Sequence, residues 1–175
     1  QSGRNWGWVR IMGRDPGEIP LGLESMRLWQ DMDRLVGGDT GFTRSGIVYV
    51  PDTPSRLAEH EAQHTHARTY QLDSRLLSTR ELEAVLPGGK RAFAGALFTP
   101  SDARAEPQKA VPAMARALRR HGGAVLTRCA VRGIETAGGR ISAVVTERGP
   151  IACQRVVLAG GAWSRLFLGN LGIDF

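Results

Sequence analysis

The sequence predicts a mixed α/β fold for this chain of 175 residues, and three observations support it. Apolar residues recur at three- and four-residue steps over 17–36 and 107–121, as they do on one face of a helix. Short β-branched runs separated by paired glycines fill the last third of the chain, as in consecutive hairpins. A composition of 42% hydrophobic and 23% charged residues is that of a globular chain, which excludes a disordered or fibrous protein.

Local signals place the boundaries of the predicted elements up to residue 121. The first helix should end at Gly37-Gly38, because glycine commonly follows the last helical residue. The second helix should open at Asp52-Thr53-Pro54, with proline in its first turn. A third helix should begin at the capping box that starts at Ser78, and this helix should end at Pro87-Gly88-Gly89. The expected elements, in order, are a helix (17–36), a strand (47–50), two helices (from 52 and from 78), a strand (94–99) and a helix (107–121).

Two of these helices have apolar faces that should point into the core. The face of the first helix consists of Ile19, Leu23, Met26, Trp29, Met32 and Val36. The inner face of the last is predicted to consist of Val111, Met114, Ala115 and Leu118.

The last third of the chain is predicted to form strands. Four strand-like runs cover 124–127, 131–136, 141–147 and 151–158. Gly138-Gly139 and Gly149-Pro150 separate the last three, as hairpin turns would. A buried strand at 156–159 should then lead through Gly160-Gly161 into a helix that begins near Ala162.

This strand–Gly-Gly–helix unit could carry chemistry. Without a Cβ at Gly160 and Gly161, another group can approach the main chain closely, and the N-terminus of the following helix favours an anion such as a phosphate. An ordinary strand-to-helix connection explains the same pattern. The chain contains no G-x-G-x-x-G, so the main phosphate-binding turn of a dinucleotide site is missing from it.

The residues here resemble a family. Val156-Val157-Leu158-Ala159-Gly160-Gly161-Ala162-Trp163-Ser164 is similar to the V-V-x-A-x-G-A-W-S segment of flavoenzymes of the D-amino-acid oxidase type, which include glycine oxidase, sarcosine oxidase and D-amino-acid dehydrogenases. Ser2-Gly3-Arg4-Asn5-Trp6-Gly7-Trp8 resembles the segment that passes near their flavin ring. The helix over 107–121, Gly122-Gly123-Ala124, Val131 and the hairpins follow the order of that family.

The resemblance implies part of an FAD-binding, Rossmann-like domain with a β-meander, plus a substrate-side antiparallel sheet layer with helices. Three divisions follow: a flavin-proximal segment and helix (1–41), the substrate-side layer (42–105) and part of the FAD-binding domain (106–175). The family's G-x-G-x-x-G strand would lie before Gln1 and its C-terminal part after Phe175, so we expect a fragment that binds FAD weakly or not at all and is inactive alone.

The resemblance also implies roles for individual residues. On the isoalloxazine side of FAD would lie Arg4, Asn5, Gly7 and Trp8. Val131 would meet the adenosine end, and the pyrophosphate would pass Ala159, Gly160 and Gly161. Trp163 would pack behind that turn, unless it is a plain core tryptophan.

The implied reaction is hydride removal from an amine or amino acid, in which the flavin performs the chemistry and the protein supplies orientation and electrostatics. The resemblance names no catalytic acid or base.

One alternative is a zinc hydrolase, since His60-Glu61-Ala62-Gln63-His64 fits H-E-x-x-H. On a helix, His60 and His64 share a face and Glu61 could act as general base. Polar flanks and the lack of an evident third ligand favour a solvated amphipathic helix instead, so no metal is expected.

A second alternative is a basic binding module, given the net charge of +6. The basic residues are nearly all arginines spread singly, with no run longer than two, whereas a nucleic-acid site usually shows a clustered stripe, so no nucleic-acid partner is expected. No apolar run is long enough for a membrane span. Two cysteines and no signal-like start indicate a reducing, cytoplasmic location. Exposed strand edges would favour a homo-oligomer.

Overall fold

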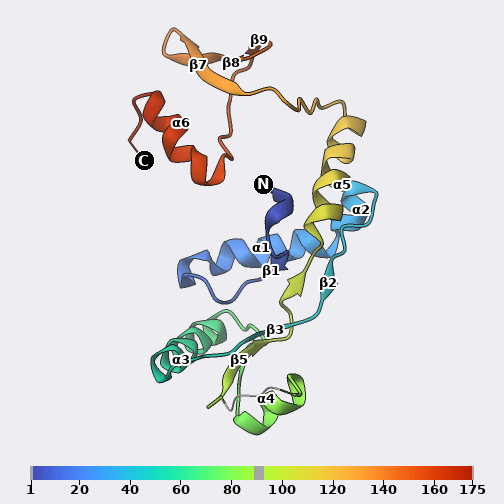
Figure 1. Cartoon of the computed structure of the whole chain (residues 1–175), viewed down its shortest axis with the longest axis vertical. Coiled ribbons are helices and arrows are strands. Elements are labelled where there is room, and N and C mark those ends of the chain that lie inside the picture. The colour runs from blue at the N-terminus through green and yellow to red at the C-terminus, as the bar shows by residue number, and fades with distance from the viewer. Residues whose placement is uncertain (1, 89–92, 175) are drawn as a thin grey trace. The chain divides into compact units, whose positions relative to one another are not determined.

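The computed structural model describes residues 2–88 and 93–174, and its contacts divide the chain into two units, residues 1–123 and 124–175 (Figure 1). Gly89, at the predicted end of the third helix, lies outside the described residues. Within those residues the strands form three antiparallel sheets of three strands each, so the mixed α/β class is confirmed. All strand pairs among them are antiparallel, so they show no parallel, Rossmann-like pairing.

The first unit contains the elements up to residue 120, in which η marks a 3-10 helix. In chain order they are η1 (Ser2–Arg4), β1 (Trp8–Val9), η2 (Pro16–Glu18), α1 (Ile19–Gln30), α2 (Met32–Val36), β2 (Thr43–Arg44), β3 (Ile47–Tyr49), α3 (Pro54–Thr69), β4 (Arg75–Leu77), α4 (Thr79–Val85), β5 (Ala96–Thr99), β6 (Ala103–Arg104) and α5 (Pro107–Arg120).

The sheet of β3, β5 and β4 has helices packed on both faces. Side chains alternate between the two faces along a strand, so in β5 Leu97 points one way and Ala96 the other. Leu97 packs with Ala67 of α3, whereas Ala96 packs with Leu82 of α4. The capping box at Ser78 is confirmed, with both of its hydrogen bonds present. α3 and α4 therefore cover opposite faces of this antiparallel sheet.

The smaller sheet, in the order β1-β6-β2, packs against α1. Trp8 pairs with Arg104 and Val9 with Ala103, so the N-terminal segment lies beside a strand almost a hundred residues later. Under this sheet lies a buried apolar cluster, formed by Val9, Ile11, Ile19, Met26, Ala103 and Ala105. Trp29 of α1 packs against it. Ile19, Met26 and Trp29 of the predicted apolar face thus build the floor of this region, whereas Leu23 of that face is exposed.

The helix predicted over 17–36 is interrupted in the structure. It consists of η2, α1 and α2, with a break at Asp31 between the last two. Gly37 ends α2 in the left-handed conformation, with φ of +56°, as its sequence position predicted. The chain after α2 is held by Asp33. One of its carboxylate oxygens accepts hydrogen bonds from the Thr40 amide at 2.8 Å and from the Thr40 hydroxyl at 2.5 Å.

α5 lies where the sequence placed a helix, but most of the predicted inner face is wrong. Its buried residues are three alanines: Ala110, Ala113 and Ala117. Two of them, Ala113 and Ala117, pack on Val36 of α2, where small side chains let the two helices approach closely. Val111 and Leu118 are 38% and 48% exposed. These two residues therefore lie away from the cluster, whereas Met114 of the predicted face packs against it.

The second unit contains β7 (Val131–Ala137), β8 (Arg140–Thr146), β9 (Gly149–Ala152), η3 (Gly161–Trp163) and α6 (Ser164–Asn170). The predicted β-meander is confirmed as β7-β8-β9. Gly138 and Gly139 have φ of +57° and +75°, the positive values that a type I′ hairpin turn requires. The second turn is Glu147-Arg148 and not Gly149-Pro150, because Gly149 already pairs with Thr146 in the ladder.

Two strand predictions in this unit are wrong. Residues 124–127 and 153–158 are irregular, and Val157 is 90% exposed, so the predicted buried strand at 156–159 is absent. A strand is stabilised by a neighbour that pairs with its backbone groups. The Cys153 amide still donates to the Ser142 carbonyl of β8, but no described strand pairs with residues 124–127 or 154–158. Among the helices that the structure describes, none is both long and apolar enough to cross a membrane.

Candidate functional site

The first unit has a cavity of about 730 Å³. Its lining comes from residues 4–14, from Trp29 of α1 and from residues 105–114, three stretches that the β1–β6 pairing and the packing of α1 bring together. Four residues predicted from the sequence line it: Arg4, Asn5, Gly7 and Trp8. The structure therefore gathers that part of the predicted site into one place.

Gly7 is where this lining is most constrained. The Asn5 side chain accepts a hydrogen bond from the Gly7 amide at 2.7 Å, and the Gly7 carbonyl accepts one from the Ala105 amide at 2.8 Å. Gly7 has φ of +74°, and a Cβ built on it would lie 2.1 Å from the Ala105 carbonyl oxygen. Only glycine allows this approach of the N-terminal segment to the chain after β6.

Aromatic rings form one wall of the cavity. Trp6 and Trp8 meet edge to face, with ring centroids 5.2 Å apart. They are 81% and 48% exposed, which is unusual for indoles in a unit that has buried apolar clusters elsewhere. The guanidinium of Arg10 lies 5.0 Å from the ring centroid of Trp8. Exposed, ordered indole rings of this kind are suited to a flat aromatic ligand.

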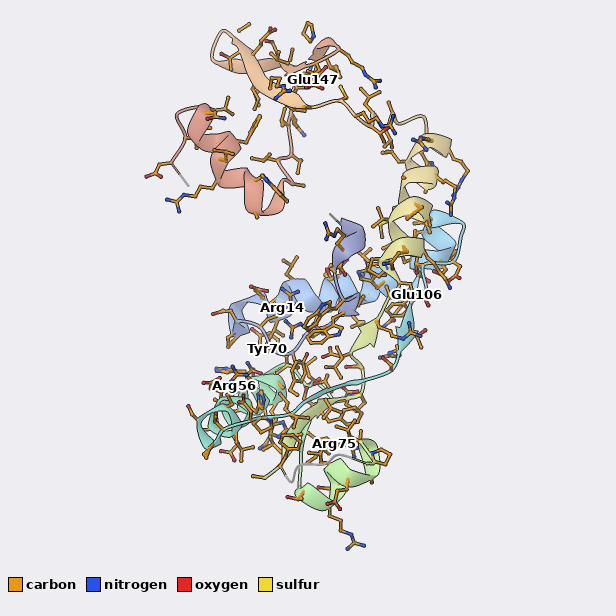
Figure 2. The ribbon with its side chains drawn as sticks, viewed as in Figure 1. Arg14, Arg56, Tyr70, Arg75, Glu106 and Glu147 are labelled. Atoms are coloured by element: carbon orange, nitrogen blue, oxygen red, sulfur yellow. The ribbon has the colours of Figure 1, made fainter. Side chains whose placement is uncertain are left out.

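The charge of the lining is positive. Arg4, Arg10 and Arg14 contribute to it, and no aspartate or glutamate does. Arg14 is paired with Glu18 at 2.9 Å, and its position beside α1 can be followed in Figure 2. Arg4 and Arg10 form no ion pair among the described residues, although the buried Asp102 carboxylate attracts Arg10. The lining therefore fits an aromatic group that carries or develops negative charge.

Asp102, which the sequence did not single out, lies behind this wall. Its side chain is fully buried, and Oδ1 accepts a hydrogen bond from the Ile11 amide at 2.7 Å. The Tyr49 hydroxyl lies 3.1 Å from Oδ2 and 2.8 Å from the Met12 carbonyl oxygen. Burial raises the pKa of Asp102 to about 6, although the bonds that it accepts oppose the rise. Burial, and the charge of Asp102, also raise the pKa of Tyr49.

The remaining predicted residues belong to the second unit. Val131 begins β7 and is 46% exposed, and Ala159 and Gly160 lie in the irregular segment before η3. Gly161 has φ of +56°, and a Cβ built on it would meet no atom within 4 Å. Trp163 is 56% exposed, so it is not a core tryptophan of this unit. The helical turn begins at Gly161, one residue before the predicted start.

The zinc alternative finds little support in the geometry. His60 and His64 lie on α3, and Nδ1 of each is buried without a hydrogen-bond partner. Across residues 2–88 and 93–174, however, no three histidine, cysteine or acidic side chains are grouped as metal ligands would be. His60 lies beside the Tyr49 ring, at 6.2 Å between centroids, and burial lowers its pKa.

Comparison with known proteins gives a consistent result. The chain matches the family described as "FAD dependent oxidoreductase", DAO, over residues 1–175. It is 36% identical to the L-amino acid deaminase from Proteus myxofaciens, solved in complex with anthranilate, with a TM-score of 0.89 over 100% of this chain and 40% of that one. It is 32% identical to the L-amino acid deaminase from Proteus vulgaris, with a TM-score of 0.86 over 99% of this chain and 42% of that one.

A curated relative extends the comparison. Mitochondrial sarcosine dehydrogenase from Mus musculus is 28% identical over 141 residues, which are 77% of this chain and 15% of that protein. The chain thus spans less than half the length of each of these three proteins.

Proposed function

Since the chain belongs to the DAO family of FAD dependent oxidoreductases, we propose that it forms part of an enzyme that oxidises an amine or amino acid, with the cavity of the first unit on the isoalloxazine side of FAD. Family membership confirms the resemblance predicted from the sequence and assigns FAD as the cofactor. The observation that carries the proposal is the cavity itself, whose lining combines exposed indole rings with guanidinium groups and contains no carboxylate.

The residues of the cavity have distinct roles in this proposal. FAD, when bound, supplies the hydride acceptor. Trp6 and Trp8 would cover one side of the ring system and exclude water there. Arg4, close to the ring, would stabilise negative charge that accumulates on it. Asn5 would act indirectly, through its hydrogen bond to the Gly7 amide.

Arg10 supports an amino acid, rather than a simple amine, as the substrate. Its guanidinium lines the large cavity and also an adjoining one of about 180 Å³, so an anion bound to it would lie beside the occupant of the large cavity. A guanidinium matches the geometry of a carboxylate. The names of the two Proteus deaminases and of the sarcosine dehydrogenase all refer to amino acids that carry a carboxylate.

The ring site can be tested with FMN, which has the isoalloxazine ring without the adenosine half. We expect FMN fluorescence to be quenched by the chain with a Kd of about 0.1–1 mM, and Trp8→Ala to weaken binding about tenfold, because a stacked ring contributes about 1.5 kcal/mol. Tyr70→Ala is the matched control, since Tyr70 is 41% exposed and lines neither cavity. Equal affinities for Trp8→Ala and the unsubstituted chain would contradict this assignment.

The pyrophosphate role proposed for Gly161 is tested separately, with FAD and the longest soluble form of the protein. Gly161→Ala should lower the free energy of unfolding by only about 1 kcal/mol, because φ is positive but the space is open. If a phosphate approaches this backbone, FAD affinity should nevertheless fall at least tenfold. Gly172→Ala, with φ of +72° and equally open space in the same unit, is the control. Unchanged FAD affinity in Gly161→Ala would rule the role out.

A further inference from the structure

Arg10 lies against two aromatic rings, and the Asp102 carboxylate attracts it without forming a direct ion pair. Its guanidinium lies 5.0 Å from the Trp8 ring centroid and 5.9 Å from that of Tyr49, and none of the described ion pairs includes it. An ion pair would fix the guanidinium but neutralise its charge. Aromatic faces attract the cation and leave its N–H groups to meet an incoming anion.

The Tyr49 ring is itself fixed to the segment that carries Arg10. Its hydroxyl donates to the Met12 carbonyl at 2.8 Å and lies 3.1 Å from Asp102, whose other carboxylate oxygen accepts from the Ile11 amide. Residues 10–12, Tyr49 and Asp102 therefore form a closed ring of contacts.

Gly13 provides the room for this arrangement. A Cβ built there would lie 2.5 Å from Cε1 of Tyr49 and 2.7 Å from Nη1 of Arg10. The Tyr49 ring and the guanidinium both occupy space that any other residue at this position would fill.

We infer that Tyr49 and Asp102 are positioning residues, which hold the charged Arg10 against Trp8 so that it can receive the carboxylate of the substrate. The inference rests on the proposed function for the identity of that anion. The position of the Arg10 charge beside Trp8, however, can be measured without flavin or substrate. Tyr49 acts on the cavity through Arg10, and Asp102 acts through Tyr49.

The test uses iodide, an anionic quencher of tryptophan fluorescence, and acrylamide, a neutral one. In a background of Trp6→Phe and Trp163→Phe, the remaining indoles are Trp8 and Trp29, and both line the cavity. The ratio of the iodide quenching constant to the acrylamide quenching constant then reports the charge beside these two rings. A change in ring exposure affects both constants and therefore largely cancels in the ratio. At constant ionic strength, Arg10→Gln should lower this ratio about twofold.

Tyr49→Leu should lower the ratio to the same value as Arg10→Gln, and the double variant should show no further fall. Asp102→Ala should lower it, whereas Asp102→Asn should keep it, because an amide can donate to the Tyr49 oxygen and accept from the Ile11 amide. If Tyr49→Leu does not fold, Tyr49→Phe, which preserves the packing, must give a ratio below that of the unsubstituted background.

Two matched controls, both labelled in Figure 2, belong to the same unit. Arg75 lies 5.3 Å from the Phe98 ring but lines neither cavity, so Arg75→Gln removes an equivalent cation without changing the ratio. Tyr70→Leu should likewise leave it unchanged.

A lowered unfolding midpoint with an unchanged ratio in Tyr49→Leu would show a purely structural role and overturn the inference. The FMN titration can fail independently of this test. If the unsubstituted chain does not bind FMN but Tyr49→Leu still lowers the quenching ratio, the proposed ring site is wrong and the positioning role of Tyr49 stands.

Discussion

Replacement of Asp102 by alanine should lower the free energy of unfolding by about 3 kcal/mol, since it leaves buried backbone donors of the N-terminal segment without an acceptor and opens a small cavity. The Ile11 amide donates to Oδ1 at 2.7 Å, and this bond is buried. Urea unfolding followed by circular dichroism measures the loss. Asp73→Ala is the matched control, because Asp73 is exposed and accepts one bond, from Ser101 at 2.6 Å. A loss no larger than that of Asp73→Ala would contradict the role assigned to Asp102.

Asp102→Asn should separate the hydrogen bonds from the charge. The pKa of Asp102 is about 6 in the folded chain and about 4 in an unfolded one, so the folded state binds the proton more tightly. The stability from this group is therefore complete below about pH 4, falls as pH rises through 6, and is absent above it; the fall is about 2–3 kcal/mol. The asparagine variant lacks this dependence. Relative to the unsubstituted chain, it should gain stability between about pH 4 and pH 8, and a constant difference would refute the raised pKa.

Gly7→Ala should be the most disruptive of the small substitutions in the cavity, with a loss of about 3–4 kcal/mol in the free energy of unfolding. The left-handed φ costs about 1–2 kcal/mol for any residue with a Cβ, and relief of an overlap with backbone costs about 1–3 kcal/mol more. The overlap is with the Ala105 carbonyl oxygen, 2.1 Å from the built Cβ, and that carbonyl cannot rotate away as a side chain could. The loss is measured by urea unfolding.

Gly122→Ala separates the two costs. Gly122 belongs to the same unit and has φ of +82°, but a Cβ there would meet no atom within 4 Å. Gly122→Ala should therefore lower the free energy of unfolding only by the cost of the left-handed φ, about 1 kcal/mol. FMN affinity gives a second readout, since Gly7→Ala displaces the segment that carries Trp8 whereas Gly122→Ala does not. Similar losses of stability in the two variants would mean that the approach of Gly7 to residue 105 is looser than described.

The sequence could predict elements whose signals are local. Proline at position 54, the capping box at Ser78 and the glycine pair at 138–139 each act within a few residues, and all three appear as predicted. Signals that depend on a distant partner could not be evaluated in this way. The run at 156–159 has a strand composition but no described neighbour, and the helix over 107–121 presents its alanines to α2 because Val36 packs there.

The candidate site shows the same division. Arg4, Asn5, Gly7 and Trp8, which line the cavity, could be predicted because they lie together in one recognisable segment. Arg10, Trp29 and Asp102 were missed, since a lone arginine, tryptophan or aspartate carries no spacing that distinguishes it from a surface or core residue. The cytoplasmic location, the homo-oligomer, the three divisions of the chain and the roles of the individual site residues stay predictions.

The pairing of Trp8 with Arg104 sets an order of events during protein synthesis. The lining of the cavity is split between residues 4–29 and 105–114, so the cavity cannot exist until residue 114 has left the ribosome. At about 5–20 residues per second, Trp6 and Trp8 wait roughly 5–20 s for their partner strand. During that interval the backbone of Trp8 and Val9 has no partner strand, and an aromatic, basic segment is exposed to solvent without a fixed position.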